Sequence, residues 1–250
     1  MQTISGLEAK VEAEIFQALK AQIGNATDIW NLIPQVFGLL HGKSYAEVGS
    51  RNNIIYMLTN KLANDIHATV ELFLLGYPEQ AASVACSGWE LGWLIKYICL
   101  ADDQRVEEWF QHASETKSFH GNLKETIRFT SRRIYPALTE AELDAYFVSQ
   151  DLVWIDMCKI RHGNPQTFFP KVVSNLVLPT IGPQGGERTI RAGRIILFHL
   201  LVNSCQALAE WLKLHGANRQ SEPLVYQLRD IVNSLQPLAP YVQTPEAGTT

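Results

Sequence analysis

The sequence has few cysteines, and their spacing matches no motif that groups cysteines together. Four occur in 250 residues, and no two form a CxxC pair. Each lies within an apolar pattern of helical period, which is typical of a small buried side chain. We therefore expect free thiols in a reducing cytoplasm rather than a disulfide framework. The four positions are Cys86, Cys99, Cys158 and Cys205.

Several signature motifs of enzymes are also missing. The chain has no Walker loop, no GxGxxG, no GxSxG nucleophile turn, no HExxH and no Glu-x-x-His pair of the di-iron type. His67 and Glu71 would share one helix face, but two ligands alone do not make a metal site. The sequence therefore predicts neither a metal site nor a cofactor.

The chain has no excess of positive charge and no long apolar run. Its net charge is −4 with an isoelectric point near 6.0, which argues against coating nucleic acid by bulk electrostatics. Charged residues near the N-terminus occupy positions where an export signal needs apolar ones. The most apolar segment, 91–101, is interrupted by Lys96 and is too short to span a bilayer. We expect a cytoplasmic protein without a membrane partner.

Apolar residues recur with a helical period along most of the chain. This pattern predicts an all-α bundle of roughly eight or nine helices with one long Pro/Gly-rich loop at 164–186. A β-hairpin within 168–181 is an alternative for part of that loop. Residues 1–236 are expected to form one domain, with 1–42 as a candidate N-terminal appendage and 237–250 as a flexible tail. The first helical stretch should divide into 7–23 and 28–40, and a later one into 140–149 and 152–162.

Three stretches match the capping box, in which a hydroxyl and a carboxylate satisfy free N–H groups at a helix start. They are Ser5-x-x-Glu8, Ser44-x-x-Glu47 and Thr139-x-x-Glu142. The stretch Gly76-Tyr77-Pro78 has a different meaning, because glycine can close one helix and proline can open the next. A helix over 79–100, the most apolar of the chain, is therefore expected to begin there and to be central.

Glu90 is the first candidate functional residue. Between Glu79 and Asp102 only Glu90 and Lys96 are charged, and Cys86 and Ser87 share the face of Glu90. A carboxylate on such a helix should be partly buried and should need a partner. It is either a structural residue bonded to a hydroxyl or cation of a neighbouring helix, or a general base or ligand-orienting acid.

Arg161 and His162 are the second candidate, within the stretch KIRHGNP. They could serve as an acid/base and anion-binding centre, or form the basic last turn of a helix closed by Gly163 and Pro165. Successive residues on a helix point about 100° apart, so the two side chains diverge. His162 would share a face with Cys158.

A third candidate pair is Arg194 and His199, whose spacing resembles the Arg-x4–6-His motif of HEPN ribonucleases. The resemblance implies metal-independent RNA cleavage, in which arginine holds the phosphate and histidine moves protons. On a regular helix, however, the two residues lie about 140° apart. His199 would fall on a polar stripe with Asn203, and Arg194 on the side of Leu197.

Two arginine clusters are candidate anion sites. Arg128 and Arg132 are one helical turn apart and could hold one anion together. Arg188 and Arg191 lie at the expected start of a helix, where the helix dipole adds positive potential. The structural alternative for both clusters is a solvated helix face paired with acids.

The segments 74–110 and 154–165 resemble a bacterial family of uncharacterised all-helical proteins, a domain of unknown function. In that family a helix reads approximately Ala-x-x-Leu-x-Arg-x-x-x-Glu, and a later helix ends in Ser/Cys-x-x-x-His. Glu90, Cys158 and His162 match these motifs, whereas Cys86 stands at the arginine position. The helical layout of the family is distantly HEPN-like, a fold common in bacterial toxin and phage-defence systems.

Two classes of function remain open. The first is a helical binding, sensing or interaction module in a bacterial stress or phage-defence setting, with Glu90 and His162 forming a buried polar link. The alternative is a HEPN-like metal-independent ribonuclease or nucleotide-binding protein. It would use Glu90 with His162 and Arg161, or His199 with Arg194. Candidate partners are an RNA or nucleotide ligand, a second copy of the chain or another protein.

Overall fold

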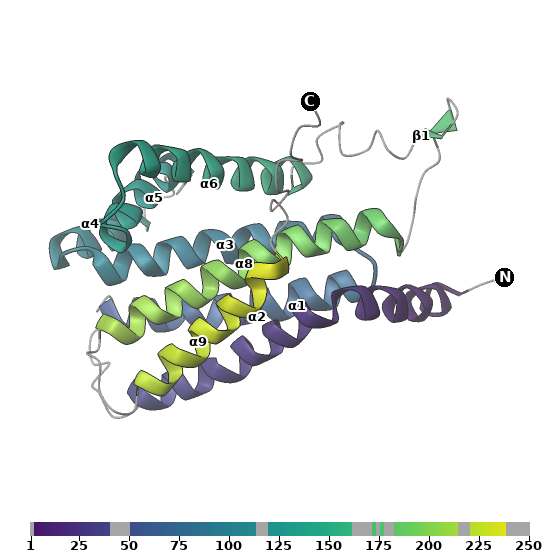
Figure 1. The fold of residues 1–250 in the computed structure, drawn as a ribbon, viewed down its shortest axis with the longest axis horizontal. Coiled ribbons are helices and arrows are strands. Elements are labelled where there is room, and N and C mark those ends of the chain that lie inside the picture. Colours follow the sequence, from purple (N-terminus) through teal and green to yellow (C-terminus); the bar gives the residue numbers. More distant parts are fainter. Residues whose placement is uncertain are drawn as a thin grey trace, which may run out of the picture.

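Long α-helices form most of the regular structure in the computed structural model (Figure 1). The structure describes residues 3–40, 51–113, 120–161, 172–173, 176–177, 183–214 and 221–238. Within these ranges lie eight α-helices, which confirms the prediction of an all-α bundle. They are α1 (Ile4–Leu40), α2 (Arg51–Leu74), α3 (Pro78–Leu100), α4 (Asp103–Ala113), α5 (His120–Ile134), α6 (Glu140–Arg161), α8 (Glu187–Leu214) and α9 (Glu222–Leu235).

Two very short strands lie within the range for which a hairpin was considered. Strand β1 (Val172–Val173) pairs antiparallel with β2 (Leu176–Val177). A short 3₁₀ helix, η2 (Gln236–Leu238), follows α9.

Helix α3 lies in the centre of the molecule, as its apolar composition predicts (Figure 1). Gly76, with a φ of 82°, lies in the short turn that follows α2, and Pro78 occupies the first turn of α3. A side chain at Gly92 would collide with the amide of Asn203, which donates a 2.6 Å hydrogen bond to the carbonyl of Trp89. The absence of a side chain at Gly92 therefore lets α3 and α8 pack closely.

One face of α3 belongs to the main hydrophobic core. This core is built by α1, α2, α3, α8 and α9, with a contribution from α4. Helix α1 supplies the fully buried Ile15, Leu19 and Ile29. Helix α1 is thus part of the wall of the bundle.

The other face of α3 meets a smaller second core. Cys86, Trp89 and Trp93 of α3 pack there against α5 and α6. The residues from these two helices are Leu123, Ile127, Leu143, Phe147, Val153 and Met157. We call the pair α5–α6 the arm, because it lies on the side of α3 opposite to α1 and α2 (Figure 1).

Two predicted helix breaks are wrong. Helix α1 continues through 23–28, where Asn25 and Thr27 bond to carbonyls one turn earlier, and it accommodates Pro34 further on. Helix α6 is continuous where a break at 149–152 was predicted. Ser149 bonds to the carbonyl of Tyr146, and Asp151 pairs with Lys124 of α5 at 2.9 Å. Polar residues at these points bond locally or across the helix pair instead of ending the helix.

The capping predictions have three different outcomes. Thr139 and Glu142 form the predicted box, with the Thr139 N–H donating to Glu142 Oε2 at 2.8 Å. The Ser5 box is wrong, because Thr3 Oγ1 accepts from the Gly6 N–H and Glu8 accepts from the Tyr77 hydroxyl instead. The stretch from Ser44 to Glu47 lies outside the described residues.

Helix α8 is the helix of the described ranges that is long and apolar enough to cross a membrane. Its segment Thr189–Leu214 has a mean hydropathy of 1.4 over the most apolar window, and 72% of that window is buried inside the bundle. A central core helix meets the same criterion, and this degree of burial matches that role.

Candidate functional site

Glu90 lies at the contact between α3 and α6. Its carboxylate is part-buried, and Oε1 accepts a 3.2 Å hydrogen bond from the indole N–H of Trp154 on α6. The thiol of Cys86, one turn earlier on α3, donates to the same oxygen across 3.7 Å. One partner of Glu90 from the neighbouring helix is thus an indole N–H, which the sequence did not predict.

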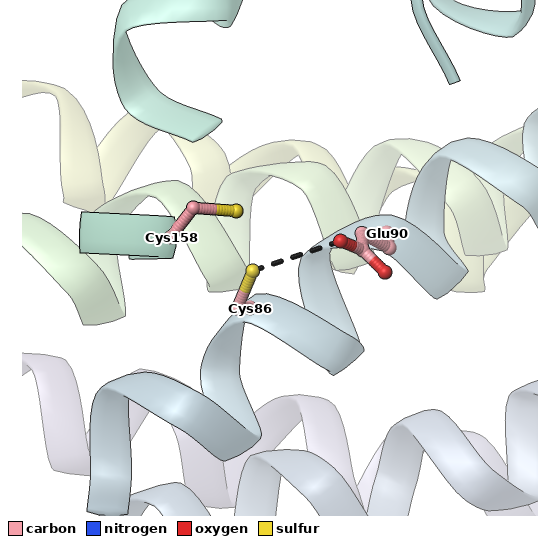
Figure 2. Close-up of side chains that lie close together, drawn as sticks. All are labelled: Cys86, Glu90 and Cys158. Atoms are coloured by element: carbon pink, nitrogen blue, oxygen red, sulfur yellow. Dashed lines mark hydrogen bonds between the residues drawn. The ribbon is translucent and has the colours of Figure 1, made fainter. Parts of the chain in front are cut away.

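Cys158 brings a second thiol to this carboxylate. It projects from α6 toward Cys86 and Glu90, as Figure 2 shows. The two sulfur atoms and a carboxylate oxygen all lie within 4.8 Å of one another. Helix geometry explains half of the arrangement, because residues four apart on α3 share a face. The packing of α6 on α3 supplies the third side chain.

These three side chains are buried to different extents. Cys86 is fully buried in the second core, whereas Glu90 and Cys158 are half-buried. The site therefore has an apolar floor and a side that solvent can reach. Thiolate and carboxylate oxygen are both ligands of zinc-class metal ions, so this cluster is the candidate metal-binding group of the described ranges.

Among the described residues, neither of the other two cysteines belongs to such a group. Cys99 and Cys205 lie in the main core, and burial raises the pKa of both thiols. They remain protonated and unreactive at neutral pH, as a buried thiol in apolar surroundings should. The expectation of four free thiols agrees with the structure, although one pair shares a site with a carboxylate.

The second candidate pair is only partly described. Arg161 is the last residue of α6, but its side chain lies outside the described residues, as does all of His162. The Glu90–His162 link therefore stays a prediction. What the structure does place beside Glu90 is Trp154 and Cys158, which occupy successive turns of α6.

Arg194 and His199 face different environments on α8. Arg194 is exposed and lines an open groove of about 1830 Å³ between α1, α8 and α9. His199 is not among the residues lining that groove, and burial lowers its pKa to about 4. The polar stripe that carries His199 is turned inward, where Asn203 bonds to α3. Within the described part of the chain, the two side chains therefore do not meet at the α1–α8–α9 groove.

The arginines within each predicted anion site also lie in different surroundings. Arg132 pairs with Glu140 at 2.9 Å, whereas Arg128 lies 5.6 Å from the ring of Phe147, beside a small hollow on the arm. Arg191 lines the α1–α8–α9 groove, together with acids that include Glu187. The side chain of Arg188 lies outside the described residues.

Two features had no counterpart in the sequence predictions. Trp154 was not recognised as a partner of Glu90, and Cys86, although predicted to share the face of Glu90, was not considered as a ligand. The four-residue spacing of Cys86 and Glu90 was a usable signal, because it puts a thiol next to a carboxylate on any helix. The predicted Glu90–His162 link brought the end of the helix carrying Cys158 towards Glu90, but it did not indicate that the Cys158 thiol itself would meet Cys86 and Glu90.

The surroundings of Lys96 are a further feature that the sequence did not predict. It is fully buried, its ammonium lies 3.2 Å from the centre of the Trp93 ring, and it donates to Gln206 Oε1 at 3.2 Å. Burial lowers its pKa well below the usual value, although the charge of Glu210 acts in the opposite direction. Its contacts with Trp93 of α3 and Gln206 of α8 connect two helices inside the bundle, which is a structural role.

Fold and site together define a class: an all-α multi-helix bundle with a thiol–carboxylate cluster between its central helix and a two-helix arm. No protein-family model, curated protein or solved structure matches the chain.

His67 and Glu71 are exposed, and no third ligand joins them in the described part of the chain.

Proposed function

We propose that the protein is a non-catalytic helical sensing module, in which the cluster of Cys86, Glu90 and Cys158 controls the position of the arm. The observation that carries this proposal is that the three groups come from two helices belonging to different parts of the molecule. A change in the spacing of these groups must move α3 and α6 relative to each other.

Of the two helices, α6 is the one expected to move. Helix α3 is held on both faces, by the main core through Ala82 and Ala85 and by the second core through Trp89. Helix α6 has a smaller set of buried partners and carries exposed apolar residues, Val148 and Leu152, on its outer side. Segments with few buried apolar contacts open at a lower free energy than the rest of a domain.

Hydrogen exchange of the full chain tests whether the cluster holds the arm. Trp154→Phe keeps an aromatic side chain, although a smaller one, and removes the N–H that donates to Glu90. A hydrogen bond to a charged group contributes about 1.5–3 kcal/mol, so α6 amides should exchange about tenfold faster or more. Amides of α2 and α8 should be unchanged. Trp30→Phe, at a half-exposed position on α1, is the matched control.

A thiol reagent tests whether a chemical change at the cluster alters the arm. Modifying the half-buried Cys158 with N-ethylmaleimide should alter exchange in α6 of the wild type and leave α6 of Cys158→Ala unaffected. Two results contradict the proposal. One is an unchanged α6 in both experiments, and the other is an equal loss of protection in α2, α6 and α8.

For the ribonuclease alternative, Arg194 lines the α1–α8–α9 groove and His199 does not, whereas His162 and the side chain of Arg161 lie outside the described residues. Incubation with total tRNA decides between the two. We expect no cleavage above background for the wild type, His162→Ala or His199→Ala. Wild-type cleavage that either substitution abolishes would replace the sensing proposal with the enzyme. An RNA or nucleotide ligand, and a homodimer or protein partner, stay predictions.

A further inference from the structure

We propose that Cys86, Glu90 and Cys158 together bind one divalent metal ion of the zinc class, held between α3 and α6. This inference rests on the proposed function, since it names the ligand to which the arm would respond. It adds a site that the sequence did not predict.

The spacing of the donor atoms agrees with such a site. Zinc lies about 2.3 Å from thiolate sulfur and about 2.1 Å from carboxylate oxygen, so a tetrahedral site separates its ligand atoms by about 3.5–3.8 Å. Cys86 Sγ and Glu90 Oε1 are 3.7 Å apart, and no separation within the cluster exceeds 4.8 Å. A small approach of α6 toward α3 would bring Cys158 to the remaining ligand position.

The chemistry of the donors selects the ion. Two sulfurs and one carboxylate favour zinc and related transition metals over Mg²⁺ and Ca²⁺, which prefer oxygen ligands throughout. Three protein ligands leave one of the four positions to water or to a further side chain. The half-buried Glu90 and Cys158 provide the route by which an ion can enter.

Trp154 adds the outer support that a ligating carboxylate normally has. Its N–H donates to Glu90 and so fixes the orientation of the carboxylate, a kind of contact whose loss lowers metal affinity by about 10–100-fold. A purely structural role for Cys86 would explain its burial. It would not require a carboxylate one turn away and a second thiol from another helix.

Cobalt titration of the reduced, metal-free full chain is the direct test. Co²⁺ held by thiolates in a tetrahedral site absorbs strongly in the near ultraviolet and the visible range, and Zn²⁺ should displace it. We expect one Co²⁺ per chain, no competition by Mg²⁺, and binding weakened more than about tenfold in Cys86→Ser, Cys158→Ser and Glu90→Gln. Trp154→Phe should weaken binding by about tenfold while keeping the thiolate absorption.

Controls separate loss of a ligand from loss of the fold. Cys99→Ala and Cys205→Ala remove buried thiols far from the cluster and should bind Co²⁺ as the wild type does. Far-ultraviolet circular dichroism checks that each variant is helical. Three results would overturn the inference: absence of the thiolate–cobalt absorption from the wild type, its retention in both Cys86→Ser and Cys158→Ser, or an equal loss in the two control variants.

Failure of the metal site and failure of the sensing module can be told apart. If no metal binds but Trp154→Phe still loosens α6, the sensing proposal stands and the metal inference is wrong. If Zn²⁺ binds with the expected ligands but leaves exchange in α6 unchanged, the metal site stands and the sensing proposal is wrong.

Discussion

At the residue scale, His199 occupies a position where the fold disfavours a charge. Burial lowers its pKa from about 6.5 to about 4, so between these values the unfolded chain binds a proton that the folded chain does not. His199 therefore leaves the free energy of unfolding unchanged above about pH 6.5 and lowers it as the pH falls from 6.5 toward 4. His199→Gln should therefore reduce the loss between pH 7 and pH 4.5 by on the order of 2 kcal/mol.

Urea unfolding of both proteins at the two pH values measures this difference. Other groups that titrate in the same window are common to both proteins and cancel in the comparison. Equal losses of stability in wild type and variant would show that His199 is protonated in the folded protein at pH 4.5.

The partner of Glu90 illustrates what a residue pattern can predict. A lone carboxylate on an apolar helix predicts that a partner exists, because an unpartnered buried charge is too unfavourable to keep. The pattern says nothing about which helix supplies that partner. Trp154 lies 64 residues further along the chain, and only the packing of α6 on α3 brings its N–H to the carboxylate.

At the scale of elements, the close packing of α3 on α8 depends on Gly92. An added methyl group would displace the Asn203 amide and break its hydrogen bond to the Trp89 carbonyl. Overpacking of this kind costs about 1–3 kcal/mol, and a lost buried hydrogen bond adds to it. Gly92→Ala should therefore lower the free energy of unfolding by about 2 kcal/mol or more.

Gly24→Ala is the matched control for this substitution. Gly24 is exposed on α1 with no heavy atom near the added carbon, so alanine should stabilise the helix by about 0.5–1 kcal/mol. Urea unfolding measures both changes. A stabilising effect of Gly92→Ala would mean that α3 and α8 are not in close contact at this point.

Helix boundaries show where local patterns reach their limit. Thr139 and Glu142 satisfy each other within one turn, so that helix start could be predicted from the sequence alone. The breaks predicted near Asn25 and Ser149 were wrong. These polar side chains bond to backbone carbonyls of the preceding turns, while apolar residues on both sides continue to face a core.

At the scale of the whole molecule, a part-buried chain of hydrogen bonds connects the two cores. Lys96 of α3 donates to Gln206 of α8, which donates to the hydroxyl of Tyr135 at the end of α5. Tyr135 in turn contacts Tyr146 of α6, a buried side chain whose pKa is raised well above its usual value, mainly by desolvation. The arm is thus joined to the bundle at a second point besides the thiol–carboxylate cluster.

Lys96 makes this connection sensitive to pH. Its folded-state pKa lies well below the unfolded value of about 10.5, so in the window between them the unfolded chain holds the extra proton. Stability should therefore rise with pH across that window in the wild type. Lys96→Met removes this rise, so the stability of the variant relative to the wild type should be greater at pH 7.5 than at pH 9.5.

Urea midpoints at the two pH values test the prediction, and Lys213→Met is the control for an exposed lysine at the end of α8. A constant difference between Lys96→Met and the wild type would show that Lys96 stays protonated in the folded protein across this range.

The sequence by itself determined the all-α class, the central place of α3, the turn at Gly76 and Pro78, and the need of Glu90 for a partner. These follow from interactions within a few turns of one helix, which periodicity and capping chemistry report directly. Only the tertiary structure decided that α6 lies against α3 and brings Cys158 to Cys86 and Glu90. That contact joins residues about 70 positions apart, and it arises from packing of the second core, for which no local pattern is a guide.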